Sequence, residues 1–241
     1  MKAIILAAGK GTRLNGAAIR PKCLIEVGGT SLLERQIASL EHEGISEIVV
    51  VVGFAAAEVR DHCKRGIAFV ENENFSETSS LYSLWLAREH MANGFVVLNS
   101  DVLFHHQILR LLLSSARPNA LLLDYRRGAT DAMGEEEMKV IVKGQLVIDI
   151  SKDIDPIRAD GENVGIAKFS EDGASTLLVC LSDLVKKGQV KDWAPRAFLE
   201  FAREKPLYAI STAGYPWIEV DFPEDYQKAL TEIYPQISSE S

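Results

Sequence analysis

Cysteine and long apolar runs are both scarce in this chain. The three cysteines, Cys23, Cys63 and Cys180, are widely spaced and form no Cys-x-x-Cys pair, so neither a disulfide framework nor a zinc site is indicated. The apolar run at residues 3–8 is too short for a signal-peptide core of ~7–15 residues. The run at residues 48–57 is far below the ~18 residues that span a bilayer. We therefore expect a cytoplasmic protein that does not insert into a membrane.

Positive charge is also in deficit, because the chain carries a net charge of −8. A protein that binds a nucleic-acid polymer normally presents a basic face, so we expect no nucleic-acid partner. The chain has 241 residues, of which 47% are hydrophobic, which is enough for a sizeable core in one large α/β domain. A compact group of basic residues near the N-terminus, on an otherwise acidic chain, indicates a small anionic ligand.

The basic segment follows the first predicted strand. Residues 2–7 are a short apolar run of the kind found in buried parallel strands, and Gly9 and Gly11 come directly after it. Small residues let backbone N–H groups approach phosphate oxygens closely. The cations of the same stretch are Lys10, Arg13, Arg20 and Lys22. Amides and cations together predict a cradle for a triphosphate.

Two common phosphate-binding loops do not match this segment. A P-loop ends in Gly-Lys-Ser/Thr, whereas Lys10 is followed by Gly11, and a dinucleotide fingerprint needs a third glycine where this chain has Leu14. An ordinary glycine turn after a first strand is the alternative. Arg13 and Lys22 make that alternative less favoured.

The run from Leu6 to Leu14, followed by Arg20-Pro21-Lys22, resembles the signature of the nucleotidyltransferases that make nucleoside-diphosphate sugars and related activated alcohols, the MobA-like NTP transferases. The resemblance implies that Arg13 grips the departing pyrophosphate and that Lys22 contacts the phosphates during the reaction. The loop residues that it implies in nucleotide binding are Leu6, Ala7, Ala8, Gly9, Lys10, Gly11 and Thr12.

Strand and helix patterns alternate along the first half of the chain. Residues 31–43 read as a helix with a capping box formed by Ser31 and Glu34. The runs at 47–53 and 67–71 read as strands with a helix at 55–65 between them. This alternation predicts an α/β, Rossmann-like, doubly wound sheet, mostly parallel but mixed, with ligands at the carboxyl ends of its strands. We expect a single domain over 1–241, with a nucleotide-binding half at 1–125 and an acceptor-binding half and terminal helix at 126–241.

The polar stretch at residues 71–80 follows a strand and leads into a helix at 81–90. From the residues alone it is a loop that ends in a helix N-cap. Its Thr-Ser-Ser-Leu-Tyr-Ser-Leu end resembles the cytidylyltransferase branch that activates phosphocholine-like alcohols. That resemblance implies that Glu77, Thr78 and Ser79 face the nucleotide base.

A second polar strand end is Asn99-Ser100-Asp101, after the buried run at 95–98. Mg²⁺ prefers one or two carboxylates together with substrate oxygens, and a carboxylate at this place lies where the phosphates should bind. We therefore predict that Asp101 is a metal ligand and Ser100 a nucleotide contact. The alternative is that Asp101 caps the helix expected at 104–115.

His105 and His106 are adjacent, and neighbours on a helix point about 100° apart, so they do not easily share a ligand. We expect both to be surface residues. We expect the same of His42, His62 and His90.

The second half begins with a strand at 120–125 and a hairpin at 138–142 and 146–150, which we expect to form a small acceptor-side β-hairpin lobe. Residues 161–170 complete a resemblance to the phosphocholine cytidylyltransferase-like group that covers nearly the whole chain. It implies that Lys139 or Lys152 holds the acceptor phosphate and that Glu162 faces its polar or cationic end. The alternative is that both lysines are exposed strand residues.

Helices are expected at 170–187 and 195–204, with a strand at 207–211, and then the segment 217–225 follows. Alternation along a strand places Trp217, Glu219 and Asp221 on one face, and the resemblance makes Asp221 the second metal carboxylate. An ammonium group is attracted to an aromatic face, so Trp217, with Trp193 and Tyr215, is a candidate cation cage beside Glu219. The alternative is that these rings belong to the core.

The residues and the resemblance together predict a Mg²⁺-dependent nucleotidyltransferase. It would couple a nucleoside triphosphate, with CTP favoured, to a phosphorylated or phosphono amino-alcohol such as phosphocholine or 2-aminoethylphosphonate. A sugar- or inositol-phosphate nucleotidyltransferase is the alternative, and a non-catalytic nucleotide-binding module is less favoured because both Asp101 and Asp221 are present.

Overall fold

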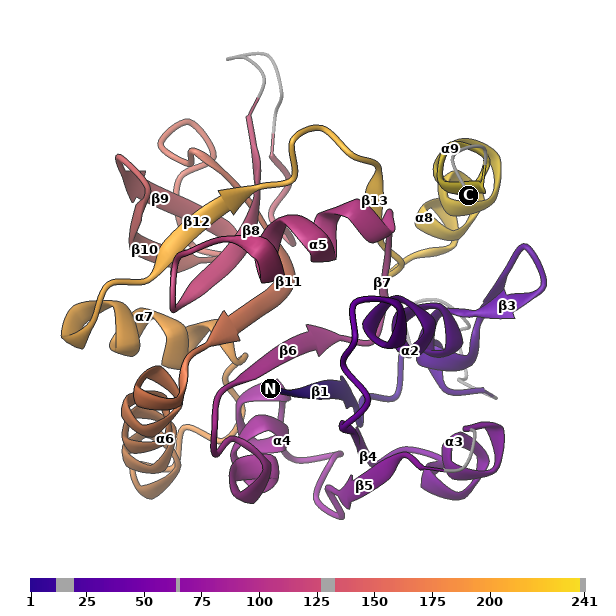
Figure 1. Cartoon of the computed structure of the whole chain (residues 1–241), viewed down its shortest axis with the longest axis horizontal. Helices are drawn as coiled ribbons and strands as arrows, with labels where there is room; N and C mark the ends of the chain where they lie inside the picture. The colour runs from indigo at the N-terminus through magenta and orange to yellow at the C-terminus, as the bar shows by residue number, and fades with distance from the viewer. Residues whose placement is uncertain (12–19, 64–65, 127–132, 239–241) are drawn as a thin grey trace.

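The fold is taken from a computed structural model, which describes residues 1–11, 20–63, 66–126 and 133–238. Four parallel strands form one half of its main sheet (Figure 1). In spatial order they are β5 (Ala68–Glu71), β4 (Ile48–Val52), β1 (Lys2–Ala7) and β6 (Phe95–Asn99). Their registers place Leu6 between Val51 and Asn99. The carboxyl ends of these strands thus share one edge of the sheet, as predicted.

The other half of the sheet is mixed. β11 (Gly161–Phe169) runs antiparallel to β6 and to β8 (Ala120–Tyr125), and β12 (Tyr208–Ser211) is parallel to β8. The expected hairpin is present as β9 (Lys139–Lys143) and β10 (Leu146–Ser151). It is not a separate lobe, because β10 pairs with β12 and β9 pairs with the start of β11, so the hairpin belongs to the same nine-stranded sheet.

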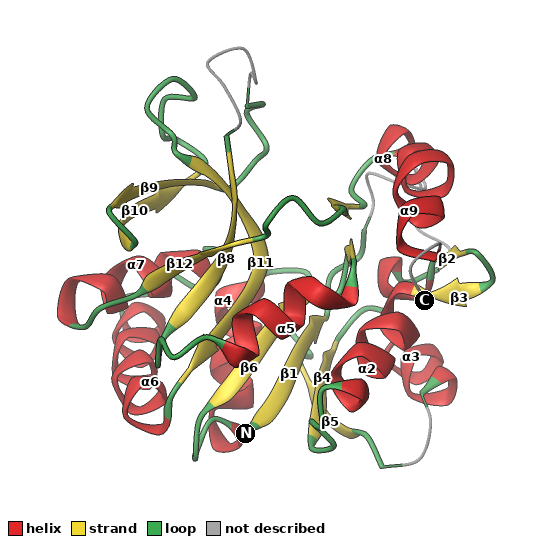
Figure 2. Cartoon of the chain, turned by 45° about the horizontal axis from the view of Figure 1, so that its top comes forward, coloured by secondary structure: helices red, strands yellow, loops and turns green. Residues whose placement is uncertain are grey.

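Helices cover both faces of this sheet, as Figure 2 shows. One face packs against α4 (Ser80–Leu86), α6 (Glu171–Lys186) and α7 (Pro195–Glu204), and the other against α2 (Leu32–His42), α3 (Ala56–His62) and α5 (His106–Ser114). Short 3₁₀ turns, η1 (Lys22–Leu24) and η2 (Ala87–His90), precede α2 and follow α4. The predicted doubly wound α/β class is therefore confirmed.

A smaller apolar cluster joins the two ends of the described chain. The hairpin of β2 (Glu26–Val27) and β3 (Thr30–Ser31) packs against the terminal helices α8 (Pro223–Lys228) and α9 (Tyr234–Ser238), which a π-helical segment, η3 (Ala229–Ile233), connects. Val27, Val220 and Ala229 are fully buried in this cluster. It fixes the segment after Lys22 against the segment after Asp221.

No helix among the described residues is long and apolar enough to cross a membrane.

Candidate active site

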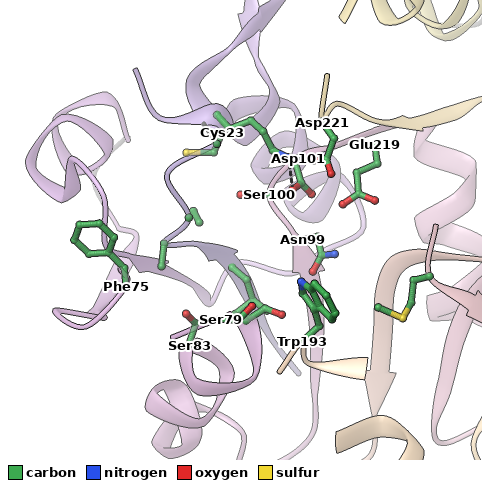
Figure 3. A pocket seen from close by; sticks show the side chains of 18 of the residues that line it. Cys23, Phe75, Ser79, Ser83, Asn99, Ser100, Asp101, Trp193, Glu219 and Asp221 are labelled. Atoms are coloured by element: carbon green, nitrogen blue, oxygen red, sulfur yellow. Dashed lines mark hydrogen bonds and ion pairs between the residues drawn. The ribbon is translucent and has the colours of Figure 1, made fainter. Parts of the chain in front are cut away.

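A cavity of about 330 Å³ lies at the carboxyl ends of β1 and β6. Figure 3 shows it with the carboxylates of Asp101, Glu219 and Asp221 gathered at one side and the ring of Trp193 across from them. Fourteen of the residues predicted from the sequence line it: Leu6, Ala7, Ala8, Gly9, Gly11, Lys22, Thr78, Ser79, Ser100, Asp101, Lys152, Trp193, Glu219 and Asp221. The two halves of the chain therefore meet in one site.

The acidic cluster is assembled by a pair of short strands. β7 (Val102–Phe104) pairs antiparallel with β13 (Trp217–Glu219), so that Glu219 lies opposite Val102. The backbone N–H of Val220 also donates a 2.9 Å hydrogen bond to the carbonyl of Asp101. These contacts bring one ligand atom each of Asp101, Glu219 and Asp221 within 4.8 Å of one another.

Lys22 lies between two of these carboxylates. Its Nζ is 2.8 Å from Oδ2 of Asp101 and forms a second ion pair with Asp221. Burial by itself would lower the pKa of the Lys22 ammonium, but attraction to Asp101 and Asp221 outweighs burial and raises the pKa above its usual value. Lys22 is therefore a permanent cation at neutral pH.

Glu219, like Asp101 and Asp221, is half-buried. Burial first, and then repulsion from Asp101 and Asp221, raises the pKa of the Glu219 carboxyl to about 8. Any cation that enters the cluster favours the ionised form of this side chain.

The donor set fits a magnesium ion. Mg²⁺ takes oxygen ligands and is held in proteins by one or two carboxylates. Asp101 and Asp221, with Glu219 beside them, offer carboxylate oxygens of this kind. In addition, Oδ1 of Asp101 is buried and has no hydrogen-bond partner within the part of the chain that the structure describes. Asp101 does not cap α5, because His105 is the N-cap residue of that helix. The alternative interpretation of Asp101 as a helix cap is wrong.

The loop before α4 forms another wall of the cavity. Asn72, which is buried, donates 3.0 Å hydrogen bonds to the hydroxyls of Thr78 and Ser83. These bonds hold the loop against the helix and present Ser79 to the cavity. Glu77, in contrast, is exposed and does not line the cavity.

Lys139 and Glu162 are among the predicted acceptor residues that lie outside the cavity lining. Lys139 is only 1% exposed, and its ammonium donates to the backbone carbonyls of Glu135, Glu137 and Lys152. It is therefore neither an exposed strand lysine nor a cation that faces the cavity. Burial first, and then repulsion from Glu137 and Asp124, raises the pKa of the Glu162 carboxyl to about 8.

The structure does not bring the three aromatic candidates together. The indole Nε1 of Trp217 donates to Oδ2 of Asp124 at 3.1 Å, and its ring packs against the core. Tyr215 stacks on His105 with ring centroids 4.9 Å apart. Trp193 alone of the three lines the cavity. Of the three residues expected on one face, Glu219 and Asp221 line the cavity, whereas the Trp217 side chain is held by Asp124 outside it.

Other predicted residues fall elsewhere. Thr12 and Arg13 lie outside the described residues. Lys10 is exposed, with its Nζ 5.6 Å from the ring centroid of Phe75.

Several cavity residues were not predicted from the sequence. They are Cys23, Asn72, Phe75, Ser80, Ser83, Asn99, Glu136, Met138, Asn163 and Pro195. Asn72 and Asn99 end or follow parallel strands, so the rule that found Asp101 applies to them as well. Asn163 has no such signal, because it reaches the cavity through an irregular pairing of β11 with β8 between Asn163 and Ala167.

A doubly wound sheet with a glycine turn after its first strand, facing a cluster of carboxylates, is the architecture of a nucleotidyltransferase. Residues 3–139 match the model of the MobA-like NTP transferase domain. The chain belongs to this family, as the sequence predicted.

Relatives along the whole chain agree with this assignment. The chain is 29% identical over 237 residues to the choline-phosphate cytidylyltransferase of Streptococcus pneumoniae, covering 97% of this chain and 98% of that protein. It is 33% identical over 229 residues to the bifunctional IPC transferase and DIPP synthase of Rubrobacter xylanophilus, covering 92% of this chain and 50% of that protein. The chain thus spans about half the length of this second relative.

The fold is also that of a solved structure, the inositol-1-phosphate CTP transferase from T. maritima. The TM-score is 0.79 at 22% identity, with 98% of this chain and 94% of that chain covered.

Proposed function

We propose that this nucleotidyltransferase uses Mg²⁺ and CTP, and that its acceptor is a phosphorylated or phosphono amino-alcohol of the phosphocholine or 2-aminoethylphosphonate kind. The observation that carries the proposal is the meeting of Lys22, Asp101 and Asp221 with the glycine turn after β1 in one cavity. The choline-phosphate cytidylyltransferase that matches the whole chain supports the choice of nucleotide and acceptor.

In the proposed reaction, an oxygen of the acceptor phosphate attacks the α-phosphorus of CTP in line. The bond between the α-phosphorus and the bridging oxygen breaks, and pyrophosphate leaves with the electron pair. The acceptor phosphate is already an anion at neutral pH, so no side chain has to remove a proton from it. Catalysis then rests on position and on neutralised charge.

Each group of side chains has a defined part in this proposal. The backbone of Gly9 and Gly11 approaches the triphosphate, and Arg13 and Lys22 neutralise the charge that develops on the phosphates. Asp101 and Asp221 would hold Mg²⁺, which when bound neutralises phosphate charge. Ser79 and Thr78, which line the cavity, are proposed to face the base.

The acceptor end is proposed to lie between Glu219 and Trp193. A carboxylate and an aromatic face together attract an ammonium group, whereas a sugar needs several hydrogen-bonding side chains around its hydroxyls.

A screen of pyrophosphate release tests the proposal. CTP, UTP, GTP, ATP and dTTP are each combined with phosphocholine, 2-aminoethylphosphonate, inositol 1-phosphate and glucose 1-phosphate. We expect the highest kcat/KM for CTP with a cationic acceptor, and loss of activity when EDTA removes the metal. Asp101→Asn serves as the inactive control for the same preparation.

A specific alternative is an inositol-phosphate cytidylyltransferase, since the fold matches a transferase of that name. A clear preference for inositol 1-phosphate over both cationic acceptors would establish this alternative. Pyrophosphate release with none of the pairs would contradict the proposed reaction.

A further inference from the structure

Lys152 places a cation on the side of the cavity that Trp193 lines. The Nζ of Lys152 is 4.6 Å from the ring centroid of Trp193 and 3.0 Å from Oε2 of Glu136. All three side chains line the same cavity as Asp101 and Glu219. An aromatic face combined with a carboxylate is the usual recognition element for an ammonium group.

Hydrogen bonds from the buried Lys139 hold this arrangement in place. The ammonium of Lys139, at 2.8 Å from the carbonyl of Lys152, also reaches the carbonyls of Glu135 and Glu137. Lys139 therefore connects the turn that bears Glu136 to the backbone of Lys152, which follows β10. The ion pair between Glu136 and Lys152 is consequently formed by two backbone segments that Lys139 holds together.

A second cavity, of about 560 Å³, adjoins the same pair. Met138, Lys152 and Trp193 line both cavities, so the Lys152 side chain lies at the boundary between them. The second cavity is also lined by four carboxylates, those of Asp149, Asp153, Asp155 and Asp192, and by the cations of Arg158 and Arg196. If the Lys152 ammonium leaves the ring of Trp193, it can therefore move into this second cavity, where carboxylates outnumber cations.

Trp193 itself is 48% exposed. A large aromatic ring that is open to solvent beside a catalytic cavity is available to a ligand. The Lys152 ammonium lies over the face of this ring.

We propose that Trp193 and Glu136 form a subsite for the cationic head group of the acceptor, and that the Lys152 ammonium occupies this subsite until a ligand displaces it. This inference rests on the proposed function, because it assigns the ammonium head group of the proposed acceptor to named side chains of that site. Lys152 then sets specificity, since a neutral head group gains too little at Trp193 to displace a lysine.

Choline is a suitable probe, because it has the cationic head and no phosphate. Titration calorimetry of the full chain with choline measures the subsite alone, so a contact between Lys152 and the acceptor phosphate has no influence on the result. Lys152→Met keeps the length of the side chain and removes its charge. We expect it to bind choline more tightly than the wild type by roughly two- to thirtyfold, the range that a cation–π contact supplies.

Three variants complete the test. Lys152→Arg retains a cation and should bind choline as the wild type does. Lys143→Met removes an exposed lysine of β9 that lines neither cavity, and should also leave binding unchanged. Adding Trp193→Leu to Lys152→Met should abolish the gain, because the ring face is lost.

Equal choline affinity in the wild type and Lys152→Met would overturn the inference, and so would a gain that persists without Trp193. The proposed function is judged separately, by pyrophosphate release with phosphocholine. An enzyme that uses phosphocholine but shows no gain in Lys152→Met retains the function and loses the subsite. A gain in choline affinity without turnover retains the subsite and contradicts the function.

Discussion

Lys22 neutralises two carboxylates at once, and this defines what its loss should do. In Lys22→Met the carboxylates of Asp101 and Asp221 face each other without their cation, and the phosphates lose a charge-assisted contact of ~1.5–3 kcal/mol. We expect pyrophosphate release to fall about ten- to a hundredfold, with a lower melting temperature. Lys22→Arg, which keeps the charge, should retain the melting temperature. Wild-type turnover in Lys22→Met would contradict the role.

Asp101 and Asp221 are expected to act as one unit through a shared metal ion. Asp101→Asn and Asp221→Asn should therefore each nearly abolish turnover, and the double variant should be hardly worse than either single one. Steady-state kinetics over a range of Mg²⁺ concentrations measures this. Losses that multiply in the double variant would show two independent roles.

Glu162 makes stability depend on pH. Its pKa is raised from 4.5 to about 8, by burial first and then by Glu137 and Asp124, so between these values the folded chain binds a proton that the unfolded chain does not. Its contribution to stability is thus present at low pH and is lost as the pH rises through about 8. Glu162→Gln should weaken the fall in melting temperature between pH 5 and pH 8.5. Glu89→Gln, at an exposed glutamate, should leave the wild-type slope unchanged, and an equal effect of both variants would refute the assignment.

Individual residues were predictable where the cause is local. The capping box of Ser31 and Glu34 is confirmed, because both partners lie within one helical turn. His105 was expected at the surface but is 1% exposed. Its Nδ1 accepts the backbone N–H of Gln107, and its ring stacks on Tyr215, which is distant in sequence. Contacts between residues that are distant in sequence cannot be predicted from a local sequence pattern.

At the scale of elements, the β2–β3 hairpin and the terminal helices depend on one glycine. A Cβ on Gly28 would lie 2.1 Å from Cζ of Tyr234, a ring that also receives the Arg35 guanidinium at 4.7 Å. Between the same hairpin and α8, the hydroxyl of Tyr226 donates a 3.1 Å hydrogen bond to the carbonyl of Glu26. The hairpin and α9 are therefore closely apposed.

Gly28→Ala should separate these elements. Gly28 and Gly29 both have positive φ angles, +61° and +77°, but a Cβ on Gly29 would meet nothing within 4 Å. Gly29→Ala is thus a matched control for backbone strain, and the difference between the two variants reports the clash. We expect Gly28→Ala to be less stable than Gly29→Ala by ~1–3 kcal/mol in denaturant titrations, with lower turnover. Equal stabilities would refute the contact.

Most elements were predictable because their apolar patterns are regular. The strands at β1 and β4 and the helix α7 were predicted within a residue or two of their observed ends. β11 was not assigned as a strand, since Gly165, with a φ of +82°, interrupts it. A Cβ there would lie 2.8 Å from Nδ2 of Asn99, so the glycine is required by a neighbouring strand and not by the local chain.

For the whole molecule, the sheet order explains which parts of the site the sequence could predict. The phosphate loop and Asp101 follow from short motifs at the ends of parallel strands. The cation cage does not follow from a short motif. Trp193, just before α7, lines the cavity, whereas Trp217, at the start of β13, is bonded to Asp124 and does not. Which of the two tryptophans lines the cavity depends on how strands from both halves of the chain pair.

The Lys22–Asp221 ion pair joins residues 199 positions apart, and this has a consequence in time. Contacts between distant parts of a chain form late, because the entropy of closing the large loop must first be overcome. In refolding from urea, the far-UV circular dichroism signal should therefore recover before pyrophosphate release does. Measuring both signals in one dilution experiment checks this, and activity that returns in the earliest phase would contradict it. If activity returns late, as we expect, its recovery marks the final step of refolding, after the secondary structure has formed.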